Sequence, residues 1–151
     1  MTTLKASTTA QWPLVATFSF NAADDMLNTS AVSKTFGDAT PGAFDIFTPP
    51  PNSMVVGGMV KVETIAAGNT STIDIGDSDD TDRYTEANPV DLADADGAYT
   101  VFDMLGDHKV YDGAQKIRVT FANGGAVTAT KAHIIVYMIV LNRANENLKT
   151  V

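Results

Sequence analysis

Apolar and polar residues alternate along much of this 151-residue chain. In Leu14–Phe20 (LVATFSF), every second residue from Leu14 onward is apolar, whereas Thr17 and Ser19 fall on the opposite face. Lys116–Phe121 (KIRVTF) repeats this pattern. A period of two is typical of a strand that buries one face. The pattern therefore predicts a strand at each place.

Turn residues separate further segments of the same kind. The pattern predicts strands at Phe44–Thr48, Met54–Ile65, Thr70–Ile75, Tyr99–Phe102 and Lys109–Tyr111. Gly68-Asn69 predicts a hairpin between the second and third of these segments, and Gly57-Gly58 indicates a bulge or a close backbone approach. We expect loops at Asp24–Ser33 and at Gly76–Gly97, because neither stretch has a sustained period.

The last long segment, Lys131–Asn142, is apolar on both faces from Ala132 to Leu141. Such a strand lies in the centre of a sandwich, or another subunit covers its second face. Repeated short strands with regular turn signals predict an all-β, single-domain β-sandwich, jelly-roll-like in type. We expect this domain at residues 14–151, after a polar N-terminal arm at residues 1–13.

Charge and composition exclude several classes of function. The formal net charge of −8 argues against nucleic-acid binding, which needs clustered Lys and Arg. The chain has no cysteine, so it can form no disulfide, thiolate nucleophile or cysteine-ligated zinc site. Its longest apolar run, Ile134–Leu141, falls short of the roughly 20 residues that a spanning helix needs. Because Met1–Pro13 also lacks the pattern of a secretory signal, we expect neither export nor a membrane partner.

The sequence contains no recognisable catalytic motif. Gly76-Asp-Ser-Asp-Asp lacks the second glycine of a nucleophile elbow, and no phosphate-binding or dinucleotide-binding glycine loop is present. His108 lies beside Asp107 and Lys109 in a turn, and His133 lies in the apolar last segment. Because His133 has no second ligand nearby in sequence, we expect it to be a packed or interface residue. We therefore expect no enzymatic activity and no cofactor.

The acidic stretch Ile73–Tyr84 (IDIGDSDDTDRY) allows two interpretations. Asp77, Asp79 and Asp82 are weak candidates for a cation site, because hard cations prefer carboxylate oxygens. The spacing departs from a calcium loop of the EF-hand type, which needs glycine at the sixth position and glutamate at the twelfth. The other interpretation, which we favour, is a structural turn whose carboxylates are capped by backbone N–H groups and Arg83.

The middle of the chain also resembles a known family. A polyproline segment at Pro49–Pro51, then NSMVVGGMVKVET, TIDIGDS and TDRY, is similar to a segment of capsid decoration (cement) proteins of tailed bacteriophages and of related head-fibre base domains. The resemblance covers roughly residues 45–85. In that family the Gly-Asp turn is structural, and no functional residue of the family can be matched to a position here.

The resemblance implies a β-sandwich made in the host cytoplasm that binds the major capsid protein on the capsid exterior. It further implies a homotrimer that bridges neighbouring capsomers. The alternative is a head-fibre or tail-associated structural or receptor-binding module.

Certain residues are expected to contact partners. They are Trp12 and Pro13 at the end of the arm, and Ile135, Tyr137 and Ile139 in the last strand. Trp12 has a second interpretation, in which it caps the core of its own domain.

Overall fold

The computed structural model describes residues 13–65, 71–86, 89–93, 97–104 and 108–141. Within these ranges the chain forms eleven strands and no helix, and so no helix that could cross a bilayer. The strands are β1 (Leu14–Asn21), β2 (Asp25–Leu27), β3 (Ser33–Thr35), β4 (Gly42–Phe47), β5 (Ser53–Thr64), β6 (Thr72–Asp77), β7 (Val90–Asp91), β8 (Tyr99–Val101), β9 (Val110–Tyr111), β10 (Ile117–Ala122) and β11 (Lys131–Val140).

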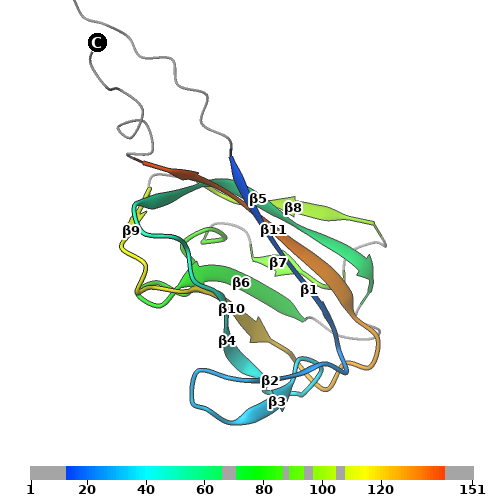
Figure 1. The fold of residues 1–151 in the computed structure, drawn as a ribbon. Helices are drawn as coiled ribbons and strands as arrows, with labels where there is room; N and C mark the ends of the chain where they lie inside the picture. Colours follow the sequence, from blue (N-terminus) through cyan, green and yellow to red (C-terminus); the bar gives the residue numbers. More distant parts are fainter. Residues whose placement is uncertain (1–12, 66–70, 87–88, 94–96, 105–107, 142–151) are drawn as a thin grey trace, which may run out of the picture.

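Two antiparallel sheets form the body of the protein (Figure 1). Sheet I has the order β1-β11-β5-β8, with β9 also paired to β5, and sheet II has the order β4-β10-β6-β7. When β2, β3 and β9 are set aside, sheet I contains the first, eighth, third and sixth strands, and sheet II the second, seventh, fourth and fifth. This order is that of an eight-stranded jelly roll. The predicted all-β sandwich is therefore confirmed.

The core lies between the two sheets because the strands of each sheet turn a row of apolar side chains toward the other sheet. In β11, Ile134 and Val136 are buried, and in β10, Ile117 and Val119 are buried. One end of the core is aromatic. There Phe36 lies with its ring centroid 4.7 Å from that of Phe44 and 5.1 Å from that of Phe121.

The segment predicted as a loop at Asp24–Ser33 is instead a hairpin, in which β2 pairs with β3. The side-chain oxygen of Asn28 accepts hydrogen bonds from the backbone N–H groups of Ser30 and Val32, each at 3.0 Å. This asparagine turn closes strands of only three residues, which are too short to show a period in the sequence.

The predicted hairpin between the segments at 54–65 and 70–75 is wrong, because β5 belongs to sheet I and β6 to sheet II. Each strand pairs instead with a strand from the C-terminal half, β5 with β11 and β6 with β10. The predicted loop at 76–97 also contains a short strand, β7, whose buried Val90 pairs with Ile73.

The glycine pair in β5 combines a bulge with a close approach. The register with β11 shifts between Tyr137, opposite Gly57, and Met138, opposite Val55, so the extra residue of the bulge is Val56, directly before the pair. A Cβ atom on Gly58 would lie 2.5 Å from the carbonyl oxygen of Ile135 and would collide with the ring of Phe102. On Gly57 the nearest atom would be Cδ2 of Tyr137, at 3.9 Å.

We expect Gly58→Ala to lower the free energy of unfolding by about 1–3 kcal/mol, because the added methyl group overpacks this crossing. Gly57→Ala is the matched control, and we expect it to change stability by less than about 1 kcal/mol. Urea denaturation followed by fluorescence measures both. Equal losses in the two variants would contradict the close approach at Gly58.

Candidate docking face and aspartate-centred turn

The outer face of sheet I carries a continuous group of apolar side chains. Ile135, Tyr137 and Ile139 alternate with the buried residues of β11 and are half-buried on the outside. Residues directly opposite each other in a ladder point to the same side of a sheet. Val15 lies opposite Tyr137, and Met59 lies opposite Ile135.

Shorter strands extend this surface on the far side of β5. Val101 in β8 is 58% exposed and lies opposite Met59, and Val110 in β9 is 50% exposed and lies opposite Met54. We call the whole group the apolar face; it comprises Val15, Met54, Met59, Val101, Val110, Ile135, Tyr137 and Ile139. A contiguous apolar surface of this kind marks an interaction site in a soluble protein.

Polar residues close one end of the apolar face. Nδ1 of His133 lies 2.6 Å from Oγ of Ser19, and its Nε2 lies 3.4 Å from Oε1 of Glu63. Lys131 Nζ lies 2.5 Å from Oε2 of the same glutamate. The hydrogen bond from Lys131, followed by that from His133, lowers the pKa of Glu63. His133 therefore lies on the outer surface at the rim of the apolar face.

The outer face of sheet II has the opposite character. Oδ1 of Asp45 in β4 is 2.9 Å from Nη2 of Arg118 in β10, and its Oδ2 is 3.4 Å from Nζ of Lys116. An ionic surface of this kind is well solvated and needs no covering partner. The two outer faces of the sandwich thus differ, and the apolar one is the candidate docking face.

The structure places the predicted contact residues unequally. Ile135, Tyr137 and Ile139 lie together on the apolar face, and Pro13 is exposed directly before β1. Trp12 lies outside the described residues. Sequence reasoning missed Met59 and Val101, because a pattern along one strand does not show which strand lies beside it.

The acidic turn after β6 is built around Asp77, whose side chain is fully buried. Its Oδ2 accepts hydrogen bonds from Nε of Arg83 at 2.9 Å, Nζ of Lys109 at 3.2 Å and the hydroxyl of Tyr111 at 3.0 Å. Its Oδ1 accepts the backbone N–H groups of the two residues at 79 and 80, at 2.8 and 3.1 Å. Both carboxylate oxygens are therefore engaged by the protein itself.

These contacts set the pKa of Asp77. Burial alone would raise it, but the backbone N–H of Asp79, the Tyr111 hydroxyl, Lys109 and Arg83 together hold the pKa below its ordinary value. Burial also raises the pKa of Tyr111, whose hydroxyl lies against that of Tyr84. Asp77 is thus an ionised residue whose side chain connects β6, β9 and the turn.

The other two candidate cation ligands lie in different surroundings. Asp79 contacts Lys109 with its Oδ2 2.5 Å from Nζ. Burial, and then the charge of nearby Asp82, raises the pKa of Asp74, and the hydrogen bond with Asp82 raises the pKa of Asp80. Across the described ranges of the chain, no group of three His, Cys, Asp or Glu side chains is arranged to hold a metal ion. The geometry of Asp77 agrees with the structural interpretation of the turn.

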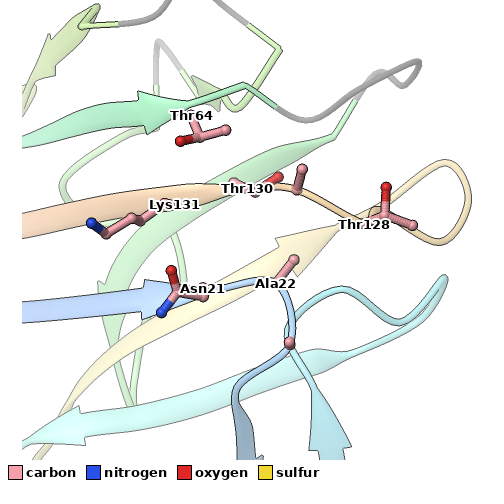
Figure 2. Close-up of a pocket in the computed structure, with 8 residues that line it drawn as sticks. Asn21, Ala22, Thr64, Thr128, Thr130 and Lys131 are labelled. Carbon is pink, nitrogen blue, oxygen red and sulfur yellow. The ribbon is translucent and has the colours of Figure 1, made fainter.

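A shallow pocket of about 190 Å³ opens where β1, β5 and β11 meet the loop before β11 (Figure 2). Its lining includes the side chains of Asn21, Thr64, Thr128 and Lys131. Oγ1 of Thr130 is buried there without a hydrogen-bond partner among the described residues.

Comparisons with known proteins were made by sequence and by structure. No known protein family matches the sequence, and no curated protein matches it.

Two solved structures of phage capsids contain chains of similar fold. A chain of the "Cyanophage Pam1 capsid asymmetric unit" matches with a TM-score of 0.59 and 15% identity, over 92% of this chain and 94% of that one. A chain of the "Acidic stable capsid structure of Helicobacter pylori bacteriophage KHP30" matches with a TM-score of 0.52 and 12% identity, over 85% of this chain and 94% of that one. At such identities the likeness establishes that this chain shares the fold of those two chains.

Proposed function

We propose that this chain is a structural protein of a phage virion that binds the major capsid protein on the outer surface of the capsid. In this role it is a decoration, or cement, protein that stabilises the shell by bridging capsomers. The observation that carries the proposal is the apolar face, which occupies only one of the two outer faces of the sandwich. The shared fold with chains of two phage capsid structures supports the same assignment.

The distribution of polarity fits a molecule that sits on a surface. The apolar face gains free energy when a partner removes it from water, at about 25 cal/mol per Å² of apolar area. The ionic face of sheet II, with Asp45 paired to Arg118, remains stable in contact with solvent. The net charge of −8 keeps the particle exterior solvated and mutually repelling.

Bridging requires that one assembly touches more than one capsomer. A homotrimer meets this requirement, because three copies around an axis present three docking faces to the shell. We assign Ile135, Tyr137 and Ile139 to the surface that contacts the capsid, since on β11 they lie at the centre of the apolar face. Pro13 comes directly before β1, whose Val15 belongs to the apolar face.

Counting copies in purified virions tests the proposal. Quantitative mass spectrometry of gradient-purified particles gives the number of copies of this chain per copy of the major capsid protein. A ratio near one supports a protein that coats the lattice. A few tens of copies per particle would instead assign it to a head fibre or the tail, and absence from particles would overturn the virion role.

The docking face is tested by adding charge to it. We expect Tyr137→Asp to weaken binding to capsids that lack this protein by at least tenfold, because a buried unpaired carboxylate opposes contact with an apolar surface. Ala122→Asp adds the same charge at an exposed position at the end of β10 in sheet II, and we expect it to bind like the wild type. Cosedimentation with capsids measures both, and equal weakening would contradict the assignment of the face.

A further inference from the structure

Sheet edges differ in how well they are protected. An unpaired edge strand is a template for another chain, and proteins shield such edges with short strands, charges, bulges or covering loops. β7 and β8 have only two and three residues. β4 contains Asp45 and carries a bulge at Ile46 in its ladder with β10, and the carbonyl oxygen of its Ala43 accepts the N–H of Thr29 at 2.9 Å.

β1 has none of these protections. It runs for eight residues in unbroken register with β11, and its sequence LVATFSFN contains no charged residue, proline or glycine. It lies at the end of the strand order in sheet I (Figure 1). Among the edge strands in the described part of the chain, β1 is therefore the one that is both long and unprotected.

The hydrogen bonds at the end of β1 show which backbone groups are free. The N–H of Ala22 donates to the carbonyl oxygen of Thr130 at 2.8 Å, in the same register as the β1–β11 ladder. In an antiparallel pair, bonded residues alternate, so the backbone groups of Val15, Thr17 and Ser19 point away from β11. The N–H of the next such residue, Asn21, is taken by Oδ2 of Asp24 at 2.7 Å.

We propose that β1 pairs with β1 of a second copy of this chain, antiparallel about a two-fold axis at Thr17. An edge of this kind is its own complement, because an isologous contact uses the same surface on both copies. Thr17 then faces Thr17 of the second copy, and Val15 faces Ser19. Each of these pairs exchanges both N–H···O bonds, and no like charges are brought together.

The inner side of β1 also favours a second copy over an unrelated strand. Leu14, Ala16 and Phe18 face the core but are only half-buried, whereas Phe20 at the end of the strand is fully buried. In the proposed register Ala16 lies opposite Phe18 of the second copy, so that a small side chain meets a large one twice. Pairing therefore completes the burial of apolar residues that the single chain leaves partly open.

This contact goes beyond the proposed docking role and is not the contact within the proposed homotrimer, because a two-fold axis joins a copy in one trimer to a copy in a second. It lies along the edge of sheet I, in the plane of the sheet, whereas the side chains of the apolar face project perpendicular to that plane. It is tested on the purified full-length chain without capsids, so its failure and the failure of the docking proposal are separate results.

Cysteine cross-linking tests the register directly, because the natural chain has no cysteine. Bonded residues opposite each other in an antiparallel pair have Cα atoms about 5.5 Å apart, within the disulfide range. We expect Thr17→Cys to form a covalent dimer under mild oxidation, seen on a non-reducing denaturing gel. Val101→Cys, which is also exposed and lies at the opposite edge of sheet I, is the control and should react at least tenfold more slowly.

A second pair of variants keeps the test independent of one cysteine. Val15→Cys mixed with Ser19→Cys should cross-link, and each alone should not. Thr17→Lys removes no bond of the fold but places two ammonium groups opposite each other, so it should weaken self-association at least tenfold in sedimentation. Cross-linking of Thr17→Cys no faster than Val101→Cys, or unchanged association of Thr17→Lys, would overturn the proposal.

Discussion

Asp77→Asn is expected to lower the free energy of unfolding by about 3–5 kcal/mol, because it removes one partner of a buried ionic network. The amide keeps the size of the side chain and the acceptor for the turn N–H groups, but it carries no charge. Arg83 and Lys109, whose side chains are only 13% and 16% exposed, then lose their buried counter-charge. Urea denaturation at neutral pH measures the loss.

Asp79→Asn is the matched control for this experiment. Asp79 contacts the same Lys109, but its side chain is 59% exposed. Exposed ion pairs contribute little, so we expect a loss below about 1 kcal/mol. Equal losses in the two variants would show that the network does not depend on the buried carboxylate.

The same contacts predict how stability depends on pH. The pKa of Asp77 is lower in the folded state than its ordinary value of about 3.9. Its contribution is therefore fully present above that ordinary value and is lost as the pH falls through the lower, folded-state pKa. We expect the difference in stability between the wild type and Asp77→Asn to be constant from pH 7 to about pH 5 and to shrink below about pH 4. A difference that grows in acid would contradict this assignment.

Phe36→Ala is expected to lower the free energy of unfolding by about 3–5 kcal/mol, because it opens a cavity in the aromatic end of the core. Phe36 follows the β2–β3 hairpin and is 3% exposed. Its ring centroid lies 5.2 Å from that of Phe20, 4.7 Å from Phe44 and 5.1 Å from Phe121. One side chain thus fastens the hairpin to both sheets.

The control for this substitution is Phe47→Ala, since Phe47 is the same residue type but only partly buried at the end of β4. We expect Phe47→Ala to lower the free energy of unfolding by much less than Phe36→Ala does. In both variants the slope of the free energy of unfolding against urea concentration should equal that of the wild type. If the two losses are equal, the aromatic cluster is not the part of the core that holds the hairpin.

The strands of the sandwich are largely predictable from the sequence, because burial on one face leaves a period of two. β1 and β10 show this clearly, and their observed bounds differ from the prediction by about one residue. Which strands pair with each other is harder to predict from the sequence. Gly68-Asn69 has turn chemistry, yet β5 and β6 enter different sheets because each finds its partner far along the chain.

The candidate sites show the same division. The sequence predicts Ile135, Tyr137 and Ile139 because they form the second apolar side of one strand. Met59 and Val101 lie beside them only because of the order of strands in the sheet, which the sequence pattern does not show. Likewise, the turn after β6 gave Arg83 as a partner of its carboxylates. Lys109 and Tyr111, which also contact Asp77, are more than thirty residues away in sequence, and no local sequence pattern predicts these contacts.

The central position of β11 determines when the protein can fold during its synthesis. Leu14 pairs with Met138, and β11 separates β1 from β5 along their whole length. Until the ribosome has made Val140 and released it from its exit tunnel, β1 has no neighbour in sheet I and β5 has only the short strands β8 and β9, so sheet I cannot be completed on the growing chain. Such non-local pairing is slow and leaves apolar strands open to aggregation meanwhile. A cell producing many copies at once therefore holds a pool of chains whose sheet I is not yet assembled, and their apolar strands can associate with one another before folding is finished.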